Sequence, residues 1–408
     1  MLPTNAADDD DDEQVLGVAE YYAAILNPPC IMRMYRQLLF TQTALLLEAS
    51  SVYDKKRQRG TPRTPSVFEQ RLAWDDFCGR HGEKNHFKKH LRMTKASFDK
   101  LLSYIQHDLE VDNEKARSRG GAILPELCLY CCLRYCAGGS YSDIMYFTGI
   151  STSSFYRIVW KCIDAIINCT LLSIDFPTKT EEVIEAAKGF TTISSQGCIW
   201  NCVAVIDGYH LQMRTPSKKE VKNVKSFFSG HYRTHGVNIQ AACDHSCCFV
   251  FIGVAGPGVM GDRDAVNQIR LGSLIESLPG LYCVIGDCAY TPSEHLVPIF
   301  RGESAKTARN DNFNFFASQL RIRIEMAFGL MVKKWGILSG PLEIKICHIK
   351  RLIVAIGRLH NFCINERLLL AEEEEARRRS RRGNANMTQV GQAATFTPTN
   401  AEFDCHNI

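Results

Sequence analysis

The sequence lacks a long apolar run, and neither sign of charge is in large excess. Among its 408 residues, no apolar stretch reaches the roughly 18–20 residues that a membrane-spanning helix needs. The N-terminus carries Asp8–Asp12, where a signal peptide would have a basic and then an apolar segment. We therefore expect neither membrane insertion nor secretion. The net charge of +4 is too small to identify a partner by itself.

The charge is distributed unevenly along the chain. Residues 1–53 carry 2 basic and 8 acidic side chains, residues 54–120 carry 16 and 10, and residues 201–365 carry 19 and 12. An acidic leader followed by two basic regions is compatible with a polyanionic partner. Taken alone, however, such charge is more often an ordinary solvated surface.

Cysteine is abundant, with 18 residues. Without an export signal, these thiols should be reduced in the cytosol or nucleus. The cluster Cys128, Cys131, Cys132 and Cys136 has no second Cys or His pair at the spacing of a zinc finger. Its members lie on one side of an expected helix, so we interpret them as core residues. We also expect core positions for Cys243, Cys247 and Cys248.

A chain of this length is expected to form two domains with tails, since a typical domain has roughly 100–200 residues. We predict an acidic, partly disordered leader and basic linker over residues 1–65, and a helical domain over 66–175. An α/β domain is expected over 195–370. The charged and polar tail, 371–408, should be a helix that frays into disorder.

The helical domain contains a pattern typical of a helix-turn-helix. A short helix from Ser140, a turn at Gly149 and a second helix that begins after Ser151 fit residues 140–160. The second helix would have only Arg157 and Lys161 as basic residues. A plain helical hairpin without DNA contact is therefore at least as good an interpretation.

After residue 197 the periodicity changes from helical to strand-like. The runs Cys202–Ile206 and Leu281–Ile285 are continuously apolar, which is typical of strands buried on both faces. Two further strands should flank the turn Asp244-His245-Ser246. With long helices expected near residues 313–335 and 349–370, the order predicts an α/β fold: a mixed sheet flanked by helices.

Two aspartates follow these buried runs directly. Asp207 comes after Ile206, and Asp287 comes after Gly286. If the two strands are parallel neighbours, these residues lie about 4.8 Å apart across the sheet, at the edge where ligands commonly bind. Either aspartate alone could simply be a turn residue at a strand end.

A third acid, Glu325, lies in the expected helix around residues 313–335. Much of the surrounding helix surface is apolar, and Arg321 lies one turn earlier. The simplest interpretation is an ion pair between Arg321 and Glu325. Together, however, Asp207, Asp287 and Glu325 are the kind of oxygen ligands that Mg²⁺ or Mn²⁺ prefers, in the number that a two-metal phosphoryl-transfer site requires.

Three segments resemble, in order, the three DDE motifs of PIF/Harbinger transposases and the nucleases derived from them. They are Val-Ile-Asp207-Gly-Tyr-His210, Val-Ile-Gly-Asp287-Cys-Ala-Tyr290 and Leu320-Arg-Ile-Arg-Ile-Glu325-Met-Ala-Phe-Gly329. Gly256-Pro-Gly258 with a following aspartate, and Leu359-His-Asn-Phe362, resemble two further segments of the family. Two residues, Asp262 and Asp264, are candidates for its extra acid, and we place both outside the triad. The resemblance covers about residues 90–370.

The resemblance implies a ribonuclease-H-like fold and a DNA substrate. It also implies a divalent metal, Mg²⁺ or Mn²⁺, held by a catalytic triad of Asp207, Asp287 and Glu325. The expected activity is metal-dependent cleavage of DNA, with strand joining in a transposase. A separate Myb-like DNA-binding partner is a further implication, and an oligomer is compatible with the sequence.

Four lysines follow the first DDE motif and are candidates for phosphate contacts: Lys218, Lys219, Lys222 and Lys225. A solvated amphipathic segment is an equally good interpretation. The basic clusters Lys55–Arg59 and Arg377–Arg382 lead us to expect a nuclear protein. The alternative function is a non-catalytic DNA-binding or scaffold protein derived from a transposase; the intact triad argues against it.

Overall fold

We describe a computed structural model of the chain over residues 71–81, 86–111 and 122–393, with side chains up to Leu369 in the last helix. The predicted leader and linker, residues 1–65, with the basic cluster Lys55–Arg59, lie outside these residues. The second basic cluster lies in the last helix, where side chains are not described. No helix in the described ranges is long and apolar enough to cross a membrane.

The first part of the described chain is helical. Its helices are α3 (Trp74–His81), α4 (His86–His90), α5 (Lys95–Leu109), α7 (Pro125–Cys136), α8 (Tyr141–Thr148) and α9 (Thr152–Asn168), followed by the 3₁₀ turn η2 (Thr170–Leu172). Local chemistry explains several ends. The Thr94 side chain caps α5 by accepting a hydrogen bond from Ser97 N. Pro125 occupies the first turn of α7, and Gly149 adopts the left-handed conformation that ends α8.

The remaining elements alternate between strands and helices. After α10 (Thr180–Ile193) and η3 (Ser195–Gly197) come β1 (Cys202–Gln212), η4 (Val224–Phe227), β2 (Phe228–Ser229), β3 (Thr234–Cys243) and β4 (Phe249–Pro257). Then follow α11 (Asp262–Gln268), α12 (Arg270–Glu276), β5 (Cys283–Gly286), β6 (Leu296–Pro298), η5 (Gly302–Lys306), α13 (Ala308–Lys334), η6 (Gly336–Leu338) and α14 (Ile346–Ala393).

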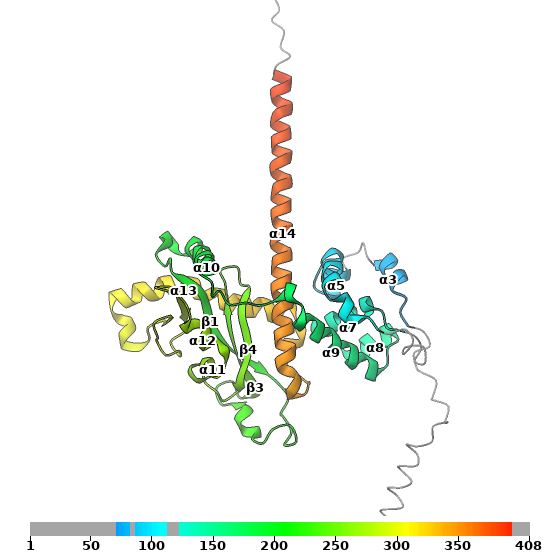
Figure 1. The fold of residues 1–408 in the computed structure, drawn as a ribbon, viewed down its shortest axis with the longest axis horizontal. Helices are drawn as coiled ribbons and strands as arrows, with labels where there is room; N and C mark the ends of the chain where they lie inside the picture. The colour runs from blue at the N-terminus through cyan, green and yellow to red at the C-terminus, as the bar shows by residue number, and fades with distance from the viewer. Residues whose placement is uncertain (1–70, 82–85, 112–121, 394–408) are drawn as a thin grey trace, which may run out of the picture. The chain divides into compact units, whose positions relative to one another are not determined.

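The strands form one mixed sheet, with β1 at its centre. β1 and β3 pair antiparallel, as do β3 and β4, whereas β1, β5 and β6 are parallel. The short strand β2 pairs with the start of β3. The predicted mixed sheet flanked by helices is confirmed, as is the hairpin around Asp244-His245-Ser246 (Figure 1).

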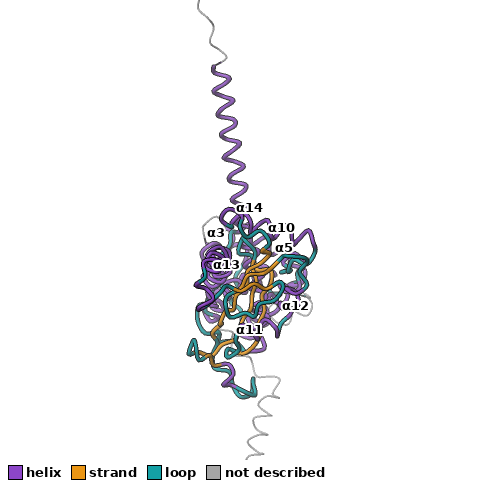
Figure 2. Tube along the Cα trace, turned by 90° about the vertical axis from the view of Figure 1, so that its left-hand side faces the viewer, coloured by secondary structure: helices purple, strands orange, loops and turns teal. Residues whose placement is uncertain are grey.

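Helices cover both faces of the sheet. The buried strands therefore carry apolar side chains on both sides. On one face, Val205 and Ile285 belong to a large core that includes α13, α14 and the helical region. On the other face, Ile206 and Val284 pack with residues of α10, α11 and α12. Figure 2 shows the strands enclosed by helices. The predicted division into domains 66–175 and 195–370 stays a prediction, since the larger core contains side chains from both.

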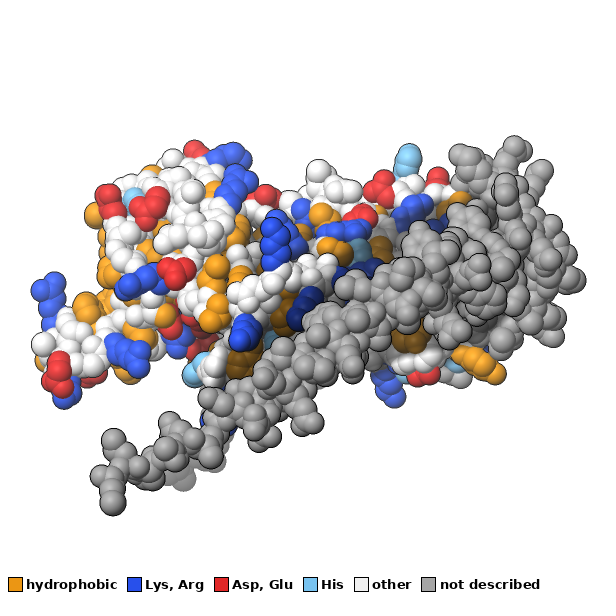
Figure 3. Space-filling model, turned by 90° about the horizontal axis from the view of Figure 1, so that it is seen from below, with side chains coloured by type: hydrophobic (Ala, Val, Ile, Leu, Met, Phe, Trp, Pro, Cys, Tyr) orange, Lys and Arg blue, Asp and Glu red, His pale blue; other side chains and the backbone are white. Residues whose placement is uncertain are grey.

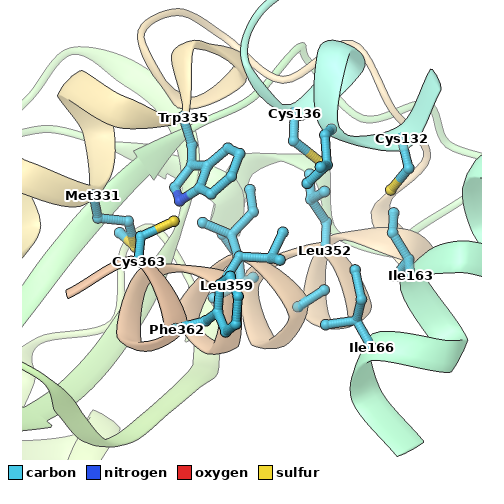
Figure 4. Close-up of a cluster of buried hydrophobic side chains, with 14 of the residues drawn as sticks. Cys132, Cys136, Ile163, Ile166, Met331, Trp335, Leu352, Leu359, Phe362 and Cys363 are labelled. Carbon is cyan, nitrogen blue, oxygen red and sulfur yellow. The ribbon is translucent and has the colours of Figure 1, made fainter. Parts of the chain in front are cut away.

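Helix α14 joins the helical region to the sheet. Figure 4 shows Leu352 and Leu359 of this helix beside Cys132, Ile166 and Trp335, side chains from α7, α9 and the end of α13. The four cysteines of α7 are buried in this core, as predicted. Helix α14 continues to Ala393, so the part of the predicted tail up to that residue is helical here.

Two polar side chains of α14 fix it to β4 and to the turn before that strand. The Asn361 amide accepts a hydrogen bond from Phe249 N at 2.8 Å and donates one to Phe249 O at 2.7 Å. His360 Nε2 donates to Cys247 O at 2.9 Å, which gives this histidine a structural role. The Leu-His-Asn segment therefore attaches α14 to an outer strand of the sheet.

Candidate active site

Asp207 lies in the middle of β1, not at its end. We expected the strand to finish with the apolar run at Ile206, but β1 continues to Gln212. The apolar run stops because β5, the neighbour on one side, ends at Gly286, while β3 still pairs with the second half of β1. Asp207 therefore lies at the position where β1 loses β5 as a neighbour and keeps only β3. A shift of register near Cys202 also places Val203 and Val205, two residues apart on the strand, in different cores.

Asp287 follows β5 and lies next to Asp207 across the sheet. β1 and β5 are parallel and pair Val205 with Ile285, so the two aspartates each come two residues after a paired position. The expectation that the two strands are parallel neighbours is confirmed. Asp287 Oδ1 accepts a hydrogen bond from Ala289 N at 2.9 Å, which holds the carboxylate in the turn.

Glu325 of α13 is connected to Asp207 through Arg321. Arg321 Nη2 lies 2.5 Å from Glu325 Oε1, which confirms the expected ion pair along the helix. The same guanidinium places Nη1 at 3.3 Å from Asp207 Oδ2. Its Nε is buried and has no hydrogen-bond partner in the described structure. One cation of α13 is thus shared between a carboxylate of the sheet and a carboxylate of the helix.

Burial makes the charged form of Asp207 unfavourable. Desolvation raises the pKa of this carboxyl from 3.8 to about 6, although the Gly208 N–H and Arg321 act in the opposite direction. The charges of Asp287 and Asp262 raise the pKa further. Three carboxylates therefore influence one another at this position, and a cation bound among them would stabilise their ionised forms.

Asp262 is a site residue that sequence reasoning left unresolved. It begins α11 and faces the side of β1 opposite to Arg321, where Oδ1 accepts hydrogen bonds from Asn238 Nδ2 at 3.1 Å and Gln240 Nε2 at 2.7 Å. A Cβ atom at Gly208 would lie 1.9 Å from this oxygen, so only glycine fits beside Asp207. Asp264, the other candidate, is exposed on α11.

Tyr290 completes the polar network on that face of the sheet. Its buried hydroxyl donates to Gln240 Oε1 at 2.7 Å, while the amide nitrogen of the same glutamine donates to Asp262. The Tyr290 ring occupies the space where a side chain at Gly286 would be, 2.7 Å from a Cβ atom built there. The spacing Gly286-Asp287-Cys-Ala-Tyr290 thus has a packing reason, which a sequence pattern alone does not reveal.

Asp207, Asp287 and Glu325 all offer carboxylate oxygens, the kind of ligand that a hard divalent cation prefers. Within residues 71–81, 86–111 and 122–369, however, no group of three His, Cys, Asp or Glu side chains is arranged closely enough to hold a metal ion. The guanidinium of Arg321 lies between Asp207 and Glu325, in contact with both carboxylates. The predicted triad comes from neighbouring elements, but its carboxylates do not converge on one point here.

The four candidate lysines lie on the loop between β1 and β2. All four are exposed, and an ion pair between Arg214 and Glu220, at 2.6 Å, holds the base of the loop. Five residues of strand separate Asp207 from the end of β1, about 17 Å at the usual rise. The loop that carries these lysines therefore leaves the sheet at the far end of β1, not at Asp207.

His210, three residues after Asp207 on β1, lies on the opposite face of the strand and packs against Tyr232 and Thr234. Its ring stacks on Tyr232 with centroids 4.6 Å apart, and Nε2 lies 3.1 Å from Thr234 Oγ1. Cys243, Cys247 and Cys248 are buried around the turn before β4, as predicted.

Helices α8 and α9 occur where the sequence predicted a helix-turn-helix, but the contacts of α9 do not confirm that motif. Its Trp160 stacks on His348 of α14 at 4.2 Å, and Arg351 of α14 contacts Asp164 at 2.8 Å. Lys161 donates to Glu110 O. Of the two basic residues of this helix, Arg157 and Lys161, only Arg157 is exposed.

Residues 206–361 match the family model described as DDE superfamily endonuclease. This segment begins one residue before Asp207 and includes Asp287 and Glu325. The chain is also 20% identical over 313 residues to "Protein ALP1-like" of Arabidopsis thaliana, a match that covers 72% of this chain and 75% of the relative. No solved structure matches significantly. The resemblance to DDE superfamily nucleases, predicted from the motifs, is confirmed.

Proposed function

We propose that this protein is a divalent-metal-dependent DNA endonuclease or transposase, with Asp207, Asp287 and Glu325 as its catalytic carboxylates. The observation that carries the proposal is the sharing of Arg321 between Asp207 and Glu325. A single guanidinium reaches a carboxylate of the sheet and a carboxylate of the helix, which supports a site that both elements share. The match to DDE superfamily endonucleases over the same residues supports the nuclease class.

Each carboxylate has a separate task in the proposed site. Asp207 and Asp287, on adjacent parallel strands, would hold Mg²⁺ or Mn²⁺ together, and Glu325 would complete the site from α13. The metal, when bound, supplies Lewis acidity that makes a water or a 3′-hydroxyl a better nucleophile and stabilises the leaving oxygen. Arg321 would leave its present position and face the phosphate of the substrate. Asp262, fixed by two amides, keeps additional negative charge beside Asp207.

The mixed sheet, antiparallel from β4 to β1 and parallel from β1 to β6, is compatible with the ribonuclease-H-like fold that we propose for residues 195–370. We propose DNA as the substrate, with the exposed lysines of the β1–β2 loop as phosphate contacts. A nuclear location, a Myb-like partner and an oligomeric assembly belong to the same proposal.

On the face shown in Figure 3, Lys and Arg side chains occur in several separate places, with hydrophobic side chains between them.

The decisive experiment is the substitution Glu325→Gln. The glutamine keeps the size of the side chain but cannot hold a metal by charge, so we expect plasmid nicking with Mg²⁺ or Mn²⁺ to fall by at least about 10²-fold. Because Glu325 is half exposed, the lost pair with Arg321 should change the free energy of unfolding by less than about 1 kcal/mol.

The matched control is Glu303→Gln, which removes an exposed carboxylate that pairs with Lys306 at 2.6 Å. This variant should nick DNA like the wild type. Wild-type cleavage by the Glu325→Gln protein would reject the catalytic assignment. Failure of the wild type with either metal, with and without partner proteins, would favour the non-catalytic scaffold.

A further inference from the structure

A second concave site lies further along α13, at its C-terminal end. A cavity of about 340 Å³ is enclosed by the turn between α4 and α5, the last turns of α13 and the middle of α14. Much of its wall is apolar and includes Met93, Leu330 and Phe362. Its volume lies at the lower end of the range typical of small-molecule sites, roughly 300–1,000 Å³.

The charged side chains around this cavity are almost all positive. Five of them come from four elements or turns: Lys88, Arg92, Lys333, Lys334 and Arg367. Among the described residues, none of these five forms an ion pair with a carboxylate. The single acidic side chain of the lining, Glu366, is already bound by Lys100 at 2.7 Å and by Ser97 Oγ at 3.1 Å. The positive charge of the cavity is therefore not balanced by its own walls.

His360, in the wall of the cavity, responds to this charge. Its pKa is lowered from 6.5 to about 4, chiefly by burial; the hydrogen bond to Cys247 O opposes this change, and the nearby charges of Lys334 and Arg367 add to it. Lys334 of α13 and Arg367 of α14 thus both lie near this imidazole, and both line the cavity. The C-terminal dipole of α13 can offset part of the charge of Lys333 and Lys334, but it does not reach Lys88 or Arg92.

The backbone at Arg92 adds an independent observation. Arg92 adopts φ of 66°, a left-handed conformation that glycine or asparagine would adopt at lower cost. A bulky residue in this conformation stores backbone strain, and such residues are concentrated at ligand sites. The turn therefore holds a strained arginine at the edge of the cavity, where its charge adds to four others.

We propose that this cavity binds a nucleotide, with the phosphates at Arg92, Lys333 and Arg367 and the base against the apolar wall. Phosphate explains the number of cations, because several charge-assisted hydrogen bonds converge on one group. A bare phosphate would contact only the cations and would leave the apolar wall uncovered, whereas a nucleotide base would cover it. The nucleotide could be free in solution or be the 5′-phosphorylated end of a DNA strand. The proposal does not depend on the nuclease activity.

The test uses the full chain in EDTA, so that no metal at the acidic site contributes. ATP is titrated by isothermal calorimetry, and we expect saturable one-site binding. The double variant Arg92→Gln with Arg367→Gln should bind ATP at least about tenfold more weakly, since each charge-assisted hydrogen bond contributes about that factor or more. The control, Arg301→Gln with Arg309→Gln, removes two exposed charges near the start of α13 and should bind normally.

Further titrations separate the parts of the proposal. ATP should bind more tightly than inorganic tripolyphosphate because only ATP fills the apolar wall; equal affinity would overturn the assignment of the base. Displacement of ATP by a 5′-phosphorylated oligonucleotide, but not by its 5′-hydroxyl form, would identify a DNA end as the ligand. Displacement by neither would identify the free nucleotide. If neither ATP nor the phosphorylated oligonucleotide binds, or if both double variants weaken binding equally, the site is rejected.

Discussion

Helix α13 carries two charged sites that differ in how their charge is balanced. Glu325 and Lys333 are eight residues apart on this helix, a distance of about 12 Å. Around Glu325 the carboxylates have Arg321 as a cation of their own, whereas the cations around Lys333 have no free carboxylate among the cavity residues. The acidic site is therefore partly compensated by a cation of its own, whereas the basic cavity has no such partner.

The effects of burial and of neighbouring charges on the pKa can be distinguished at two residues, Asp207 and His360. At Asp207 burial raises the pKa to about 6, and Arg321 opposes that change. At His360 burial lowers the pKa to about 4, and nearby cations act in the same direction. We therefore expect removal of a neighbour to harm the first site and to relieve the second.

The largest expected effect on stability is the acid sensitivity due to His360. The folded pKa of about 4 is below the unfolded value of 6.5, so the unfolded chain takes up the proton first as the pH falls. The stabilisation is complete above pH 6.5 and disappears between pH 6.5 and 4, by up to about 3 kcal/mol. Urea unfolding of wild type and His360→Gln across this window measures it. Equal pH slopes for both proteins would show that His360 does not titrate this way.

A smaller effect is expected from Gly208→Ala. The new Cβ atom would lie 1.9 Å from Asp262 Oδ1 and 2.9 Å from Gln240 Nε2, so the amide network must move. We expect a loss of about 2 kcal/mol in the free energy of unfolding, which is typical of overpacking. Gly261→Ala is the control, because nothing lies within 4 Å of a Cβ atom there. Equal stability of the two variants would mean that Asp262 is not held against β1.

Removal of Arg321 tests the compensation directly. Arg321→Gln leaves Asp207 without its counterion, and we expect a loss of about 1–2 kcal/mol near pH 7, because the pair is only partly buried. If metal and arginine use the same carboxylates, Mn²⁺ should raise the melting temperature of the variant more than that of the wild type. Arg309→Gln, an exposed cation of α13, is the control. Identical Mn²⁺ shifts in all three proteins would contradict the competition.

The smallest effect should have the opposite sign. Arg92→Gly relieves both the left-handed backbone strain and the repulsion among the cavity cations, so it should stabilise the protein by up to about 1 kcal/mol. The same variant should bind ATP more weakly. Thermal melts and calorimetry on one preparation measure both changes. A destabilised variant with unchanged ATP binding would indicate that Arg92 is a structural residue.

The sequence predicted the parts of the site that depend on short patterns. A buried apolar run followed by Asp207 or Asp287 indicated two adjacent strands, and helical spacing indicated the Arg321–Glu325 pair. The contact between Arg321 and Asp207, 114 residues away, could not be predicted in this way. It depends on how α13 crosses the sheet, which is decided by packing between distant elements.

The errors have equally local physical causes. The end of β1 was placed too early because apolar periodicity reports burial on both sides, and the second half of β1 has only β3 as a neighbour. Asp262 and Asp264 could not be distinguished because a two-residue difference on α11 decides which carboxylate faces β1. For α9, the pattern of a helix-turn-helix says nothing of the contacts with α14 that occupy Trp160 and Asp164.

The attachment of Asn361 to Phe249 has a consequence for the association of this protein with itself. Among the described strands, β4 pairs only with β3, so its other side would be an open edge that can recruit a strand of another chain. The Asn361 side chain occupies one peptide group of that edge with two hydrogen bonds, as a neighbouring strand would. Helix α14 therefore protects the sheet against edge-to-edge polymerisation, and a truncated chain that ended before this helix would expose the edge.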